Sequence, residues 1–121
     1  MNAQSNKEDS KELKANSENF SRLMSIDQAN SDQIDSLVRL SILYSYFNED
    51  TCVILGERAV ELSKNIEDRG TYANALLELG DSYRIFGKLD EGEKLLLKGK
   101  SIYEEINDEG QVATANNKLG A

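Results

Sequence analysis

The stretch TYANALLELGDSYRIFG, residues 71–87, decides the fold class of this chain. Its large apolar residues recur at steps of three and four, which places them on one face of an α-helix. These residues are Tyr72, Leu76, Leu79, Tyr83 and Phe86. Gly87 is expected to end the helix, because glycine adopts the left-handed conformation without steric cost. No window of the sequence shows the alternation of a half-buried strand, so we predict an all-α protein.

A second helical segment follows Gly87 and stops at residues 107–110, NDEG. Its apolar and small residues keep the same helical spacing: Leu95, Leu96, Gly99, Ile102, Tyr103 and Ile106. Asp90 and Glu93, three residues apart, are expected to form a capping pair at its start. Two helices joined by so short a turn pack side by side, so this region predicts an antiparallel helical hairpin.

Sliding the sequence along itself reveals an internal repeat. A shift of forty pairs residues 67–70, EDRG, with residues 107–110, NDEG. A shift of thirty-nine aligns the apolar face of an earlier segment, Leu40, Tyr44 and Phe47, with Leu79, Tyr83 and Phe86. We therefore expect repeated units at about residues 34–69 and 73–109, and half of a third unit from residue 112.

Residues 1–30 precede these units. One apolar stripe there predicts a helix from about Lys7 to Ile26, formed by Leu13, Phe20, Leu23 and Met24. This segment is expected to be a capping helix over the open end of the repeats or, where weak helix formers dominate, a partly flexible arm. It contains no apolar run of the length of a signal peptide, and the compartment stays open between the cytoplasm and the bacterial periplasm.

The composition excludes several classes of function. The chain has 121 residues, a formal net charge of −8, no histidine and a single cysteine. An acidic surface repels phosphate backbones, so no nucleic-acid partner is expected, and no apolar stretch is long enough for a membrane span. Without histidine there is no histidine-based triad or common zinc site. We expect no metal, no cofactor and no enzymatic activity.

Five residues carry a resemblance to a known family: Leu76, Leu79, Gly80, Tyr83 and Gly87. Their types and spacing resemble the tetratricopeptide repeat, a helix–turn–helix unit. The resemblance covers residues 34–121 and implies antiparallel helical hairpins stacked as a short right-handed solenoid. Departures are Leu76 at an aromatic position, Glu104 where proline is common, and a spacing of forty instead of about 34 residues.

The aligned small residues are expected where two helices approach closely. They are Ser41, Gly80 and Gly120. Cys52 aligns with Gly92 at another such place, so we expect a small buried residue here; a reactive thiol is disfavoured because no cationic cluster is adjacent in sequence. The rings of Tyr44 and Tyr83 are expected to fill the gap between successive hairpins.

The resemblance also implies a ligand groove, because the first helices of such repeats line a concave surface. The matching positions here are Asp35, Val38, Ile42, Tyr46, Asn74, Leu77, Asp81, Arg84, Thr114 and Asn117. An asparagine amide can both donate to and accept from a peptide backbone, and Arg84 can pair with a carboxylate. The alternative is that these are ordinary polar residues on a solvated surface.

Two functions remain open, and a small enzyme with carboxylate chemistry is a weaker third. The first is a non-catalytic module that binds a protein or peptide, similar to the repeat regions that precede histidine kinase or nucleotide cyclase domains in bacterial signalling proteins. The second is a structural module that forms a homodimer through its C-terminal half-repeat. That half-repeat has an apolar side, Val112, Ala115 and Leu119, and no second helix to cover it.

Overall fold

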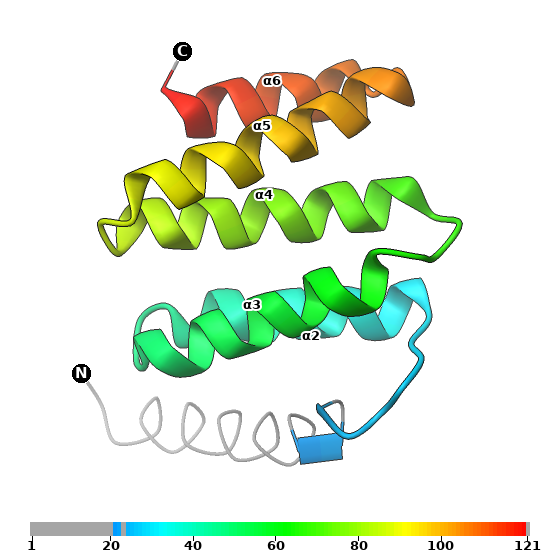
Figure 1. Ribbon diagram of the computed structural model, residues 1–121, viewed down its shortest axis with the longest axis vertical. Coiled ribbons are helices and arrows are strands. Elements are labelled where there is room, and N and C mark those ends of the chain that lie inside the picture. Colours follow the sequence, from blue (N-terminus) through cyan, green and yellow to red (C-terminus); the bar gives the residue numbers. More distant parts are fainter. Residues whose placement is uncertain (1–20, 23, 121) are drawn as a thin grey trace, which may run out of the picture.

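The computed structural model describes residues 21, 22 and 24–120 of the chain. The defined helices of this range are α2 (Ser31–Tyr44), α3 (Glu49–Ser63), α4 (Arg69–Ile85), α5 (Leu89–Glu105) and α6 (Glu109–Leu119). No strand occurs in these described residues, so the all-α prediction is confirmed (Figure 1). The helix expected from Lys7 to Ile26 lies largely outside them, as do Leu13, Phe20 and Leu23 of its stripe.

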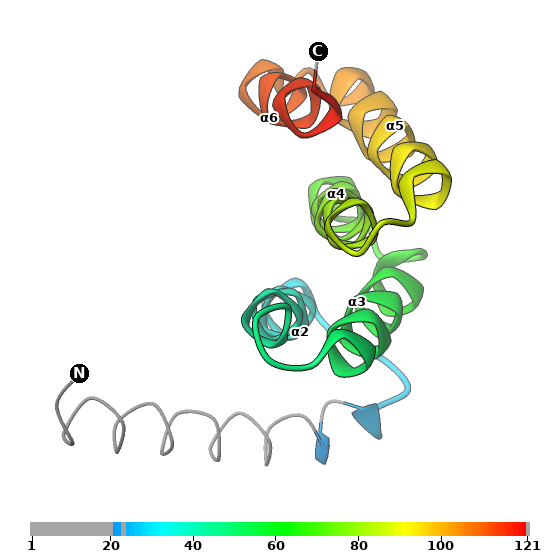
Figure 2. The same ribbon diagram turned by 90° about the vertical axis from the view of Figure 1, so that its left-hand side faces the viewer.

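The helices pair in chain order and form two layers. α2 packs on α3, α4 on α5 and α5 on α6, while α3 and α4 join the two hairpins. The partners in each hairpin run antiparallel (Figure 1). Figure 2 shows α2, α4 and α6 in one layer and α3 and α5 in the other, with α4 set back between α2 and α6. We call the concave surface of α2, α4 and α6 that faces away from the other layer the inner face.

Side chains that cap the helix starts explain most of the helix boundaries. Asn30, Asn48, Asp68 and Asp108 each accept a hydrogen bond from the backbone N–H three residues later. These caps satisfy backbone donors that have no partner within the helix. They occur before α2, α3, α4 and α6. The turn within the first hairpin and the connections between hairpins therefore use the same cap chemistry.

The predicted capping pair of α5 is wrong. α5 begins at Leu89, and its N-cap residue, Lys88, makes no side-chain capping hydrogen bond. Asp90 and Glu93 therefore lie inside the helix. The reason is the tightness of the preceding turn: Gly87 has φ +87°, and the N–H of Lys88 donates to the carbonyl of Tyr83 at 2.7 Å. The role predicted for Gly87 in ending the helix is confirmed.

Two clusters of buried apolar residues hold the layers together. The first core cluster comprises Ile34, Leu37, Val38, Leu40, Leu55, Ala59 and Ala75. The second core cluster comprises Tyr72, Ala73, Leu76, Leu77, Leu96, Ile102, Tyr103 and Ala115. Val60 packs against both clusters, so the hydrophobic packing continues from one hairpin to the next. Met24, Ile26 and Ala29 pack against the first core cluster, and this part of the N-terminal segment therefore covers α2 and α3.

The close approach expected at Gly80 is confirmed. A Cβ atom added to Gly80 would lie 2.9 Å from the carbonyl oxygen of Gly92, and one added to Gly92 would lie 2.7 Å from that of Gly80. At the matching crossing of the first hairpin, the hydroxyl of Ser41 donates to the carbonyl of Cys52 at 2.7 Å. Both hairpins thus cross at a pair of small residues.

The same expectation is not tested for Gly120. Its φ is +79°, and a Cβ atom added there would meet nothing within 4 Å. The residue is the left-handed C-cap of α6, whose backbone N–H donates to the carbonyls of Asn116 and Asn117. No described segment crosses α6 at this point, so the expected helix crossing at Gly120 stays a prediction.

A pair of glycine-to-alanine variants tests the crossing. Gly80→Ala is expected to lower the free energy of unfolding by about 1 kcal/mol or more, since overpacking against Gly92 outweighs the gain in helix propensity. Gly110→Ala should raise it by up to about 1 kcal/mol, because its Cβ would lie 3.7 Å from the nearest atom. Urea denaturation measures both. Equal effects of the two changes would contradict the tight crossing.

Candidate ligand-binding face

Three helices contribute polar side chains at matching positions of the inner face. The helical repeat places them at steps of three and four residues along each helix. They are Asp35 and Arg39 on α2, followed there by the apolar Ile42; Asn74, Glu78 and Asp81 on α4; and Thr114 and Lys118 on α6. None of these eight residues is buried, whereas the neighbouring positions Leu37, Leu76 and Ala115 belong to the core. The same rotation of each helix thus turns one polar stripe toward solvent.

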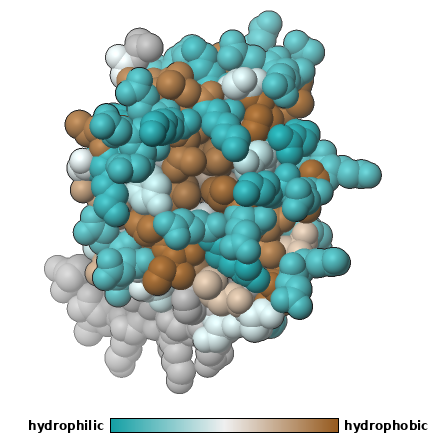
Figure 3. Space-filling model, in the orientation of Figure 1, coloured by the Kyte–Doolittle hydropathy of each residue, from teal (hydrophilic) through white to brown (hydrophobic). Residues whose placement is uncertain are grey.

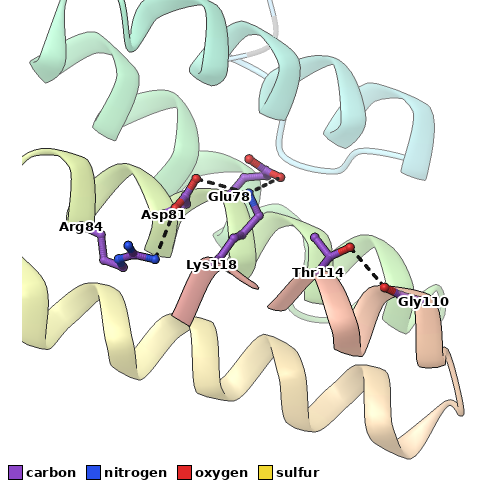
Figure 4. Close-up of polar contacts among 6 residues, drawn as sticks. All are labelled: Glu78, Asp81, Arg84, Gly110, Thr114 and Lys118. Carbon is purple, nitrogen blue, oxygen red and sulfur yellow. Dashed lines mark hydrogen bonds and ion pairs between the residues drawn. The ribbon is translucent and has the colours of Figure 1, made fainter. Parts of the chain in front are cut away.

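An ion network ties α6 to α4 across this face. The Nζ atom of Lys118 lies 3.2 Å from Oδ2 of Asp81 and 3.6 Å from Oε1 of Glu78. On the other side of Asp81, Nη1 of Arg84 lies 3.9 Å from Oδ1 (Figure 4). These side chains are partly shielded from water, so the attraction is screened less than at a fully exposed pair.

Sequence reasoning missed Lys118 and Glu78. Both follow from the shift of forty, which pairs Glu78 with Lys118, and from the step of four that separates Lys118 from Thr114. Opposite charges at matching positions of neighbouring helices are the signal that the sequence contained. Arg84 and Asp81 were predicted at this face as separate groups, but Asp81 pairs with both Arg84 and Lys118.

Asn74 occupies the centre of the polar stripe. It lies on α4, the set-back helix, and is partly buried, yet its side-chain amide makes no hydrogen bond with any described residue. On α6, the hydroxyl of Thr114 already donates to the carbonyl of Gly110 at 3.2 Å, and Asn117 is exposed (Figure 4). Of the predicted polar residues, Asn74 therefore combines a central, partly buried position with hydrogen-bonding capacity that the described residues leave unused.

The apolar members of the predicted groove divide into two kinds. Val38 and Leu77 are only 4% and 1% exposed and belong to the two core clusters, so neither presents a surface to a ligand. Each lies on the side of its helix that packs on the rest of the chain, which the family alignment did not distinguish. Ile42 and Tyr46 are 37% and 81% exposed and lie at the end of α2 and just beyond it.

Asp35 has an altered protonation equilibrium. Burial raises its pKa above the usual 3.8, the nearby carboxylates of Asp68 and Asp32 act in the same direction, and the guanidinium of Arg39 opposes them. Asp68 shows the reverse: hydrogen bonds from Thr71 and Ser31 hold the pKa of its carboxyl below 3.8. The negative charge of Asp35 is thus costly at the inner face, while that of Asp68 stabilises the start of α4.

The remaining chemical groups lie in the core or on the outer surface. Cys52 is fully buried, with its sulfur 3.6 Å from the hydroxyl of Ser82, which confirms the small buried residue that its alignment predicts. Tyr83 lies between hairpins, as predicted: its hydroxyl on α4 donates to Oε1 of Glu57 on α3 at 2.7 Å. Tyr44 packs, partly buried, against the first core cluster.

Neither a metal cluster nor a membrane helix is found in the part of the chain that the structure describes. No group of three or more cysteine, aspartate or glutamate side chains within it could hold a metal ion. None of its helices combines the length and the apolar character that crossing a membrane requires.

The helices and the polar stripe described above define an all-α protein with a polar, concave inner face. No family model matches the chain, and neither a curated protein nor a solved structure matches it.

The replacement Asp35→Asn tests the electrostatics of this face. The pKa of Asp35 is above 3.8 in the folded protein, so the folded protein holds this proton more tightly than the unfolded chain does. The free energy of unfolding therefore falls as the pH rises from 3.8 through the folded-state pKa. Removing the carboxylate should therefore raise the free energy of unfolding at pH 7, and the gain should vanish below pH 3.8. Thermal denaturation across this pH range measures the difference.

Asp68→Asn is the matched contrast. The lowered pKa of Asp68 contributes stability above pH 3.8 that is lost as the pH falls through the folded-state value. This variant should be less stable than the parent near neutral pH, with a difference that shrinks in acid. A less stable Asp35→Asn protein at pH 7 would show that the carboxylate of Asp35 is favourable where it lies.

Proposed function

We propose that the protein is a non-catalytic binding module whose inner face holds an extended peptide segment of a partner protein. The observation that carries this proposal is Asn74, a partly buried residue of the set-back helix whose side-chain amide has no hydrogen-bond partner among the described residues. An amide that solvent reaches, with free donors and a free acceptor, suits a peptide backbone, which offers one acceptor and one donor per residue.

The charges of the inner face favour a ligand of particular chemistry. Asp81 pairs with both Lys118 and Arg84, so the attraction of these charges for a ligand is reduced. Arg39 is exposed and forms no ion pair with the described residues, which leaves its guanidinium able to bind a carboxylate. Ile42 and Tyr46 offer exposed apolar surface farther along α2. A peptide with one acidic and one apolar side chain fits this set.

The architecture that we propose is a short right-handed solenoid of the tetratricopeptide type. Its support is the resemblance carried by Leu79, Gly80, Tyr83 and Gly87, and the recurrence of the same small-residue crossing at Ser41–Cys52 and Gly80–Gly92. By the same resemblance, the module would act as the sensor or scaffold part of a bacterial signalling protein of the histidine kinase or nucleotide cyclase type.

Self-association through α6 has less support. This alternative required the apolar side of α6 to lack a partner, but Ala115 is fully buried in the second core cluster, and Val112 and Leu119 pack against it. The helix therefore already covers most of its apolar side on α4 and α5. The large exposed apolar residues among the described ones lie on or beside other helices.

Peptides selected from a random phage-displayed library test the proposal. For a selected peptide, Asn74→Ala is expected to raise the Kd about three- to tenfold, the effect of losing one or two hydrogen bonds. Asn65→Ala removes an exposed asparagine at the end of α3, away from the inner face, and should leave the Kd unchanged. Fluorescence anisotropy measures both. Peptides that bind the Asn74→Ala protein with unaltered affinity would argue against this face as the site.

A further inference from the structure

A hollow lies between α3 and the turn that joins α4 to α5, away from the inner face. Its volume is about 450 Å³, and its lining residues are Glu49, Asp50, Val53, Ile54, Phe86 and Lys88. We call it the α3 pocket. Pockets that hold small ligands span roughly 300–1,000 Å³, so the space suffices for one large side chain of a partner. Val53, Ile54 and Phe86 make its apolar part, and Glu49 and Asp50 add two carboxylates.

The apolar part of the α3 pocket is not explained by the repeat. Ile54 is 47% exposed, although burying an isoleucine side chain is favourable by about 1.5–3 kcal/mol. The shift of forty pairs Ile54 with Lys94 and Val53 with Glu93, and both of these partners are exposed polar residues of α5. The surroundings of the two residues differ, because Ile54 lies beside Phe86 of the following hairpin and no described hairpin follows at Lys94. The exposed part of Ile54 still leaves apolar surface in the α3 pocket that no described residue covers.

The charges around the α3 pocket are predominantly negative. Glu49 and Asp50 are exposed and form no ion pair with the described residues. Glu57 follows two turns later on the same helix, where it accepts the hydrogen bond of Tyr83. The one lining cation, Lys88, places its Nζ atom 5.5 Å from the centre of the Tyr83 ring, so its charge is held at that ring. The two carboxylates lie in the first turn of α3, face solvent without an ion pair among the described residues, and outnumber the single lining cation.

Figure 3 views the molecule from the side of α3 and α5 and shows apolar surface exposed among hydrophilic residues on this face. Apolar surface bordered by unpaired charge of one sign is typical of an interaction site, because the charge selects the partner and the apolar contact supplies affinity. Anionic ligands, including nucleic acids and acidic lipid headgroups, are disfavoured by these carboxylates and by the net charge of −8.

We propose that the α3 pocket binds a cationic segment of a partner protein. A leucine-sized side chain of the segment lies against Ile54 and Phe86, and lysine or arginine residues on either side of it pair with Glu49 and Asp50. The site is separate from the inner face and does not depend on the function proposed for it.

Three capped peptides probe the two parts of this recognition: Lys-Lys-Leu-Lys-Lys, Lys-Lys-Ser-Lys-Lys and Glu-Glu-Leu-Glu-Glu. In NMR titrations of the full chain, the first peptide should shift the backbone amides of Ile54 and Phe86. The serine peptide should bind at least about threefold more weakly, because the apolar contact is lost, and the acidic peptide should not bind. Equal affinity of the leucine and serine peptides would reduce the interaction to charge alone and overturn the proposal.

Two protein variants with the same added charge locate the site. Ile54→Lys introduces the residue that the second hairpin has at this place and should weaken binding of the leucine peptide about tenfold. Leu97→Lys changes an apolar residue of α5 that is also 47% exposed, and it should have a much smaller effect. Equal weakening by both variants would indicate non-specific attraction to an acidic protein and would contradict the α3 pocket.

Two further controls separate this proposal from the others. Asn74→Ala should leave binding of the leucine peptide unchanged, so a failure of the inner-face proposal does not affect this test. Sedimentation of the parent protein and of Ile54→Lys is expected to show the same oligomeric state. If Ile54→Lys instead dissociated an oligomer, the pocket would be filled by a second copy of this chain, and the proposed cationic partner would be wrong.

Discussion

The crossing of the two helices within each hairpin is the constraint on which the rest of the structure depends. At Gly80 and Gly92 the backbones approach so closely that neither position has room for a Cβ atom. In the first hairpin, Ser41 and Cys52 occupy the matching crossing, and the serine hydroxyl is held there by the carbonyl of Cys52. Close contact of this kind fixes the rotation of each helix, because any turn about its axis would bring a larger side chain into the gap. The fixed rotation in turn decides which residues reach the core and which reach the inner face.

A second consequence of this fixed rotation is that charged residues at matching positions of α4 and α6 face one another. Lys118 reaches Glu78 and Asp81 because the three residues follow the same stripe on their helices. The network joins the last helix to the preceding hairpin, where the apolar contribution of α6 is modest and comes mainly from Ala115, Val112 and Leu119. An ion network of partly shielded groups therefore supplements hydrophobic packing at the end of the stack.

Much of the fold could be predicted from the sequence because it depends on spacing. The steps of three and four between Tyr72 and Phe86 indicate a helix, and the glycine at 87 marks its end regardless of what packs around it. Other features depend on tertiary geometry that spacing does not contain. Gly120 aligns with Gly80 and has a positive φ at the end of α6, and spacing alone does not show whether another helix crosses it. Val38 and Leu77 are buried because of the helix rotation, and one family alignment cannot separate such positions from their exposed neighbours.

The internal repeat offers a physical means of separating structural from functional residues within this single chain. Where both hairpins hold similar residues, as at Leu40 and Leu79, shared packing is a sufficient reason for them. Where aligned positions differ in character while their backbone environment is alike, packing cannot require both residues. Ile54 and Lys94 differ in their surroundings as well, because Ile54 lies beside Phe86 of the following hairpin and no described hairpin follows at Lys94. The stripe of the inner face varies in the same way, with Asp35 opposite Asn74. Differences also occur in the core, where Ser63 is opposite Tyr103, so only a difference at an exposed position leaves a group free to contact a partner.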